Sequence, residues 1–315
     1  MHYRAWADST NGRGHMTDFV LETVGLGKRY GRHAAIASLD LSLEAGGTWG
    51  LVGANGAGKT TLFRILLGFA APTAGRSFLL GCDSTRLRHD QRARIGFANE
   101  QHCLPGWATV ERLTRMARSR HPHWDEEIFR RALTGSALDP KRRVRDLSRG
   151  QRATFNLALT LARRPELLLL DEPTLGLDIV ARRSFLEALL YSEATNHSTI
   201  VYCSHHVDEI ERVCDRLVVM EQGRLRLTTT PEELCADLGH WISNLPFAGP
   251  PEAEIPGLLY AQRIDGLHHH IVSGQGAGFG DFLRSRGAST IRRQDVDLAS
   301  AISALLRSAG TQGGE

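Results

Sequence analysis

The stretch Gly53-Ala54-Asn55-Gly56-Ala57-Gly58-Lys59-Thr60 decides how the rest of this chain is organised. It fits G-x-x-x-x-G-K-[ST], the pattern of a phosphate-binding loop, at every position. The glycines let successive backbone N–H groups converge on phosphate oxygens, and the helix that follows adds the positive end of its dipole. Lys59 is placed for the β- and γ-phosphates of a nucleotide, and Thr60 for Mg²⁺. The predicted nucleotide-binding residues of this segment are Gly53, Asn55, Gly56, Gly58, Lys59, Thr60 and Thr61.

The residues on both sides of this loop have the pattern of an α/β protein. Thr48 to Val52 is an apolar run of strand length before the loop. Leu62, Ile65 and Leu66 share one face of the helix that is expected after it. Leu167 to Leu170 is short and fully apolar, as in a buried parallel strand. Strands that alternate with helices predict a mainly parallel sheet covered on both faces.

Two carboxylates follow the Leu167 to Leu170 run directly. Asp171 stands where the exposed end of the strand would present it to Mg²⁺, and Glu172 is one residue further on, placed to polarise an attacking water. A leucine-rich strand that ends in Asp-Glu is common by itself. Here, however, the strand lies well beyond the lysine of a phosphate loop in an α/β chain. This context indicates a Walker B strand.

A third motif distinguishes this chain from other phosphate-loop proteins. Leu147-Ser148-Arg149-Gly150-Gln151 closely resembles the LSGGQ signature of ATP-binding cassette (ABC) proteins. Further matches to that family follow in the expected order. Tyr30 matches its adenine-stacking aromatic, Leu175 to Asp178 its D-loop, and Ser204-His205 its switch histidine. The resemblance covers residues 19–228.

The resemblance implies a site shared between two such domains. They pack head to tail, with ATP between the phosphate loop of one and the signature of the other. The chain has one phosphate loop and one signature, so it needs a second copy or a related ABC subunit. The resemblance assigns catalytic roles to Glu172, His205 and Lys59. It adds to the nucleotide-binding set the residues Tyr30, Ser148, Gly150, Gln151 and Asp178.

One position of these motifs departs from the family pattern, and one histidine is additional to it. Arg149 replaces the third signature residue, which is usually glycine. Because the phosphate-facing Ser148 and Gly150 remain, we expect an active enzyme, with the Arg149 side chain pointing to solvent. His206 follows the switch histidine His205, and we expect it to be a bystander.

The Q-loop position is a further departure. The glutamine of the family is expected about five residues after Ile95, where this chain has Glu100, with Gln101 one step later. An acidic group thus stands where the family has a neutral amide ligand of Mg²⁺ and water, so metal coordination or communication is expected to differ. The implied Mg²⁺ ligands are Thr60, Asp171 and Glu100.

The expected fold is an α/β P-loop NTPase core with antiparallel edge strands, a helical signature subdomain and a small C-terminal α+β appendage. Near-alternating patterns at Phe19 to Val24 and Leu39 to Leu43 predict the edge strands. The predicted division is a disordered leader at 1–15, an ABC ATPase domain at 16–228 with its helical subdomain at about 100–165, and an accessory domain at 229–315.

Two functions remain open: the ATPase subunit of a transporter with a separate integral membrane permease, and a soluble ABC ATPase that acts on ribosomes or nucleic acid. The longest aliphatic run is far too short to span a membrane, and a net charge of +3 gives no reason to expect nucleic acid. Gln101 to Glu111 looks like the segment after the Q-loop of exporters, and the small appendage that starts at Thr230 to Leu234 is also similar to those proteins. Export is therefore favoured, with import left open, and the chain is expected at the cytoplasmic face of the inner membrane.

Three further segments are expected to have no special role. His268 to His270 is predicted to be a solvated stretch in a loop, and Gly274 to Gly280, which lacks a lysine, a flexible loop. The arginines between Arg112 and Arg120, with Lys141 to Arg145, are predicted to form a solvated basic face.

Overall fold

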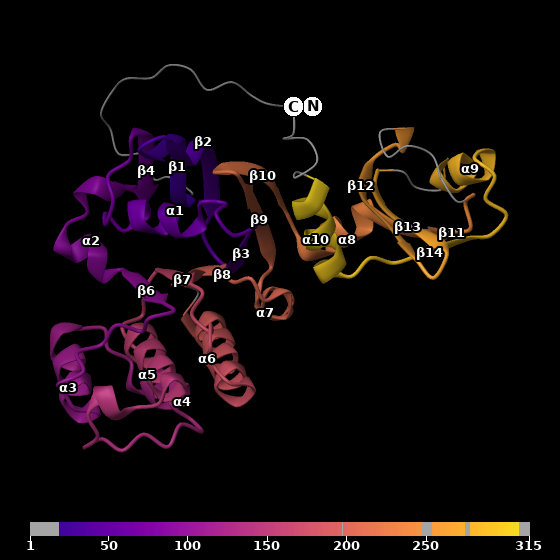
Figure 1. The fold of residues 1–315 in the computed structure, drawn as a ribbon. Coiled ribbons are helices and arrows are strands. Elements are labelled where there is room, and N and C mark those ends of the chain that lie inside the picture. The colour runs from indigo at the N-terminus through magenta and orange to yellow at the C-terminus, as the bar shows by residue number, and fades with distance from the viewer. Residues whose placement is uncertain (1–18, 197, 247–253, 275–277, 309–315) are drawn as a thin grey trace.

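The structure is a computed structural model that describes residues 19–196, 198–246, 254–274 and 278–308. The leader predicted at 1–15 lies outside these residues. The described part contains three sheets. The first two form one body with helices around them, and the third lies to one side with its own helices (Figure 1). No described helix combines the length and the apolar character that crossing a membrane requires.

The central sheet has six strands in the order β10-β9-β3-β8-β7-β6. Five of them run parallel, and β10 pairs with β9 in the antiparallel direction. Strands β3, β7 and β8 have five residues each, and every one of these residues is buried, as expected for strands covered on both faces. The strands are β3 (Thr48–Val52), β6 (Ile95–Asn99), β7 (Leu167–Asp171), β8 (Thr199–Cys203), β9 (Arg216–Glu221) and β10 (Arg224–Thr229).

A second, antiparallel sheet lies beside the central one. Its order is β2-β1-β4-β5, with β1 (Phe19–Tyr30), β2 (His33–Glu44), β4 (Ala74–Leu79) and β5 (Cys82–Asp83). Helix α1 (Lys59–Leu66) contacts β2, β4 and β7, so it lies between the two sheets. Leu62, Phe63, Ile65 and Leu66 bury its apolar face there. The predicted antiparallel strands are confirmed and are longer than the sequence pattern indicated, but β1 pairs with both β2 and β4 and is therefore not an edge strand.

The signature lies in a helical region at the β6 side of the central sheet. Helix α5 packs against α4, α6 and β6, around side chains that include the fully buried Phe155. The described helices around the central sheet are α2 (His89–Ala93), α3 (Val110–Arg120), α4 (Glu126–Ala132), α5 (Arg149–Leu161), α6 (Ile179–Asn196) and α7 (Val207–Val213), with 3₁₀ turns at Ser84–Arg86 and Val144–Asp146.

The C-terminal part forms the third sheet, in the order β12-β13-β11-β14. A small core around Trp241 and Phe279 supports it, and helix α10 packs on β12, α8 and α7. Asp297 accepts a hydrogen bond from the Ser300 amide and caps α10. Its elements are α8 (Pro231–Asp237), β11 (Leu238–Ser243), β12 (Leu258–Ile264), β13 (Leu267–Ser273), α9 (Gly278–Ser285), β14 (Ile291–Gln294) and α10 (Leu298–Ser308).

Two expectations for this part were wrong. His268 to His270 do not form a loop: they lie in β13, between β11 and β12, and His270 is buried. Pairing with β11 and β12 satisfies the backbone hydrogen bonds of this segment. The composition of a histidine run does not reveal such pairing. Gly278 to Gly280 begin α9, whereas residues 275–277 lie outside the described part. The domain boundaries proposed from the sequence stay a prediction.

Candidate functional site

The phosphate loop connects β3 to α1, and its glycines are required by geometry. Gly56 and Gly58 have φ values of +83° and +100°, a region that L side chains rarely adopt. A Cβ added at Gly58 would lie 2.4 Å from the Ala35 carbonyl oxygen, and one added at Gly53 would lie 2.4 Å from that of Met220. Both contacts are with backbone atoms, so larger residues at these positions would displace β2 or β9.

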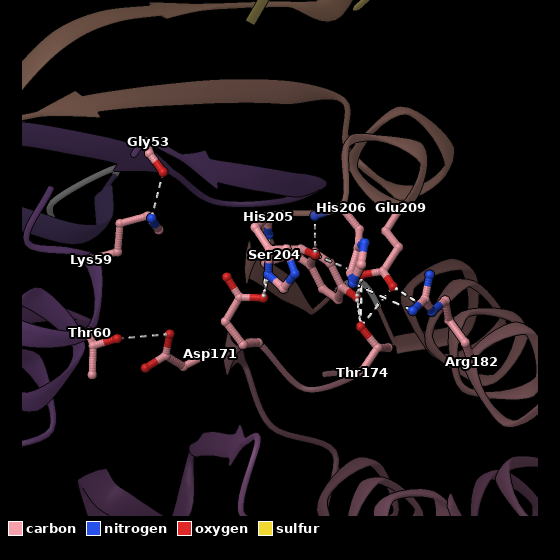
Figure 2. Close-up of polar contacts among 12 residues, drawn as sticks. Gly53, Lys59, Thr60, Asp171, Thr174, Arg182, Ser204, His205, His206 and Glu209 are labelled. Atoms are coloured by element: carbon pink, nitrogen blue, oxygen red, sulfur yellow. Dashed lines mark hydrogen bonds and ion pairs between the residues drawn. The ribbon is translucent and has the colours of Figure 1, made fainter. Parts of the chain in front are cut away.

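The Lys59 side chain points back toward the backbone of this loop. Its Nζ donates hydrogen bonds to the carbonyl oxygens of Gly53 at 2.6 Å and Ala54 at 3.2 Å (Figure 2). The residue is 9% exposed, so its charge is largely desolvated. A desolvated ammonium group at the end of a loop built for phosphate binds an anion more strongly than one in open water.

A cavity of about 590 Å³ opens in front of the loop. Eleven of the predicted site residues line it, among them Tyr30, Asn55, Gly56, Gly58, Lys59, Thr60, Thr61, Asp171 and Glu172. The other two of the eleven are Glu100 and His205. Half-exposed Tyr30 offers its ring, with Lys28 Nζ 5.0 Å from the ring centroid. His33, Ala35 and Leu175 also line the cavity and were missed from the sequence, because only the packing of β2 and the D-loop places them there.

Thr60 and Asp171 suit a divalent cation. Thr60 Oγ1 lies 3.4 Å from Asp171 Oδ1 (Figure 2), and both groups face the cavity. Burial raises the pKa of the Asp171 carboxyl, and the charges of Glu172 and Glu100 raise it further. A bound cation would reverse this effect, and hydroxyl and carboxylate oxygens are the ligands that Mg²⁺ prefers. The donor set therefore fits Mg²⁺, with Glu100 as an additional acidic group on the cavity wall.

Glu172 and His205 form a dyad at the side of the cavity. Glu172 Oε2 lies 2.7 Å from Nδ1 of His205 and 3.3 Å from its backbone nitrogen. The Glu172 backbone has φ +51° and its N–H donates to the Cys203 carbonyl oxygen at 2.9 Å. A non-glycine residue in this region is uncommon, and here it turns the carboxylate away from β7 toward the histidine. Glu172 directly follows β7 and His205 lies in the turn after β8, and the two strands are neighbours in the central sheet.

The signature residues lie outside this cavity. Ser148 caps α5: its Oγ accepts from the Gln151 amide, and the Gln151 side chain accepts from the Ser148 amide, both at 3.1 Å. Asp178 is exposed and caps the start of α6 through the Ala181 amide. The described residues that line the cavity do not include Ser148, Gly150, Gln151 or Asp178. Within one chain, the structure thus brings together the phosphate loop, Walker B and the switch, but not the signature.

Arg149 and His206 both contact neighbouring elements. Arg149 is exposed, as expected, but its guanidinium group lies against the D-loop instead of extending freely into solvent. A Cβ added at Gly176 would lie 2.5 Å from its Nη1. His206 Nε2 lies 3.4 Å from an Arg182 nitrogen, and its ring centroid is 4.1 Å from that of His205.

Comparisons with known proteins agree on one family. The family model described as "ABC transporter" matches residues 36–175. The chain is 35% identical to the "Nod factor export ATP-binding protein I" of Rhizobium etli, over 76% of this chain and 77% of that protein. It is 34% identical to "Daunorubicin resistance ATP-binding protein DrrA3" of Streptomyces coeruleorubidus, over 71% and 72%.

Solved structures share the fold. An "ATP binding subunit of ABC transporter" superposes with a TM-score of 0.61 at 24% identity, covering 69% of this chain and 92% of that one. A dimeric, post-hydrolysis ATP-binding cassette bound to ADP and Pi superposes with a TM-score of 0.58 at 20% identity, covering 67% and 98%.

Proposed function

This chain belongs to the ABC transporter family, and we propose that it is the ATP-hydrolysing subunit of an exporter whose membrane-spanning permease is a separate protein. One observation carries the proposal. The phosphate loop, the Walker B acids and the switch histidine line a single cavity of about 590 Å³. The exporter assignment is supported by the two relatives described above, which are named for Nod factor export and for daunorubicin resistance.

The residues of the site divide the work of hydrolysis. Backbone N–H groups of the loop and the Lys59 ammonium group bind and orient the phosphates of ATP, and the Tyr30 ring stacks on the adenine. Thr60 and Asp171, with Glu100 on the cavity wall, would hold Mg²⁺, which would neutralise charge on the phosphates. Glu172 accepts a proton from the attacking water, and His205 keeps that carboxylate in place through the 2.7 Å contact.

We infer that the complete site forms between two copies of the chain, or between this chain and a related subunit. The Ser148 hydroxyl and the Gly150 amide, at the N-terminus of α5, are suited to bind the γ-phosphate held by the partner. Directly after the exposed Asp178 of the D-loop, Ile179 and Val180 are 84% and 75% exposed, an apolar pair that association would cover. ATP would thus hold the two copies together, and hydrolysis would release them.

The membrane subunit is proposed to dock near the Q-loop. A small cavity of about 160 Å³ lies beside Glu100 and Gln101, with Phe69 and Phe97 in its wall, and Phe69 is 68% exposed. Trp107 is 59% exposed, with the Arg112 guanidinium 4.9 Å from its ring centroid. Phe69 shares this cavity with Glu100 and Glu172, and Trp107 belongs to the segment that starts at Glu100, so the two exposed rings suit a partner helix that must respond to the nucleotide. The chain would then sit at the cytoplasmic face of the membrane.

Co-purification tests the proposal against the ribosomal or nucleic-acid alternative. The tagged chain is recovered from detergent-solubilised membranes, and a ribosome-sedimentation assay is run on the same lysate. We expect an integral membrane protein in the pull-down and no chain in the ribosome pellet. Trp107→Ala is expected to reduce that recovery and to leave the basal ATPase rate largely intact. Recovery with ribosomes or DNA and without a membrane protein would refute the transporter assignment and leave only the ATPase.

A further inference from the structure

A fully buried carboxylate lies behind the Glu172–His205 dyad. Glu209, in the first turn of α7, has no exposed surface. Hydroxyl groups of Thr174, Tyr202 and Ser204 donate hydrogen bonds to it at 2.8, 2.7 and 2.8 Å. The Arg182 guanidinium forms an ion pair with it, with Nε 3.2 Å from Oε1. Because a buried charge is costly unless donors and a counter-ion surround it, this cluster is built for a carboxylate.

The donors come from the segments that carry the dyad. Thr174 is two residues after Glu172, and Ser204 directly precedes His205. The Ser204 hydroxyl also accepts a hydrogen bond from the His206 amide at 3.0 Å, so it organises the turn that holds the switch histidine. In Figure 2 the side chains of Thr174, Ser204 and Arg182 converge on Glu209 from three different directions. One carboxylate thus contacts both segments of the catalytic dyad.

Arg182 adds a third connection. It lies in the first turn of α6, directly after the D-loop, and it is three-quarters buried. Its ion pair with Glu209 therefore sets the start of α6 relative to the dyad. The fourth partner, Tyr202, differs from the others because it belongs to β8 itself, a strand already held by β3 and β7.

We propose that Glu209 is a positioning residue for ATP hydrolysis, holding Glu172 and His205 in contact by accepting hydrogen bonds from Thr174 and Ser204. The proposal rests on the roles proposed above for the dyad and goes beyond them. The acceptor has to be a carboxylate, since three hydroxyl groups donate to it. An amide in its place would turn an N–H₂ group toward those donors and leave Arg182 without its counter-ion.

A purely structural role would be to fasten α7 to the sheet. The two roles differ in what each hydroxyl does. Thr174→Val, Ser204→Ala and Tyr202→Phe each remove one donor to the same carboxylate with little change in shape. If Glu209 positions the dyad, the first two loosen a catalytic segment, whereas Tyr202→Phe loosens only a strand. Tyr202→Phe is therefore the matched control.

The test measures kcat, KM for ATP and the urea midpoint of the full-length chain for each variant. We expect all three variants to lower the midpoint to a similar extent. Thr174→Val and Ser204→Ala are expected to lower kcat at least ~10-fold with little change in KM, because a shift of ~1 Å in a catalytic group costs up to ~100-fold. Tyr202→Phe is expected to stay within ~2-fold of wild type, and Thr174→Ser, which keeps the hydroxyl, to restore kcat.

Equal losses of kcat in all three variants, or wild-type kcat in Thr174→Val and Ser204→Ala, would overturn the positioning role. Glu172→Gln, assayed beside them, separates this result from a failure of the dyad itself. If Glu172→Gln is inactive while both hydroxyl variants are normal, only the positioning proposal is refuted. If Glu172→Gln hydrolyses ATP at the wild-type rate, the assignment of the dyad is refuted instead.

Discussion

Replacing Gly176 by alanine adds one methyl group where the signature touches the D-loop. Gly176 has φ +73°, and a Cβ there would lie 2.5 Å from Nη1 and 2.7 Å from Cζ of Arg149. Ordinary contact between such atoms needs about 3.5 Å, so the guanidinium or the loop has to move by about 1 Å. The variant therefore tests whether the arginine in the signature lies across the D-loop.

The structure indicates two separate costs. An L residue in the left-handed region costs about 1–2 kcal/mol, whatever space surrounds it. Displacing the guanidinium adds about 1 kcal/mol, since it is the flexible end of an exposed side chain. Gly135 is a matched control, with φ +79° and no heavy atom of the described residues within 4 Å of an added Cβ, chain neighbours aside. Gly135→Ala should therefore show the first cost alone.

Urea denaturation and steady-state ATPase assays on three variants, compared with the wild type, measure these two costs. We expect Gly176→Ala to be about 1 kcal/mol less stable than Gly135→Ala and to lose about tenfold in kcat, because the displaced D-loop misaligns the shared site. In Arg149→Ala/Gly176→Ala the clash is gone, so stability should return to the Gly135→Ala level and much of the kcat should recover. A double variant as impaired as Gly176→Ala would show that the arginine does not occupy this position.

Two further outcomes follow from the site, and a third from the buried side chain of His102, two residues after Glu100. Lys59→Ala should lose most ATP binding and nearly all turnover, as measured by nucleotide titration and phosphate release; wild-type hydrolysis would contradict the role of the lysine. Glu172→Gln should bind ATP, turn over very slowly and accumulate as an ATP-dependent dimer in light scattering; a variant that stays monomeric would contradict the shared site. Burial lowers the pKa of the His102 imidazole from 6.5 to about 4, so the unfolded chain binds the proton more tightly and stability falls as the pH drops from about 6.5 to 4. His102→Asn is a suitable variant because asparagine tolerates the φ of +43° at this position. In urea titrations at several pH values, it should remove up to about 3 kcal/mol of the loss in unfolding free energy between pH 6.5 and 4. An unchanged pH dependence would contradict the lowered pKa of His102.

The contiguous motifs could be predicted from the sequence because each acts through its own backbone. The phosphate loop requires glycine at fixed spacings and a lysine at the start of a helix, and both requirements can be read along the chain. The same is true of the signature, whose serine and glutamine three residues apart form a capping box. The strand that ends in Asp171 is fully apolar because it is buried on both faces.

The tertiary structure alone decided which distant residues meet. Glu209 is one acidic residue in an amphipathic helix, and the sequence gives no sign that its carboxylate is fully buried beside Thr174 and Ser204. Likewise, the sequence does not show in which direction the Arg149 side chain extends. Gly176, the D-loop residue it lies against, is 27 residues further along the chain. Side-chain contacts of this kind depend on how β7, β8 and α5 pack. Packing depends on the whole set of neighbouring surfaces, so it leaves no pattern in any one segment.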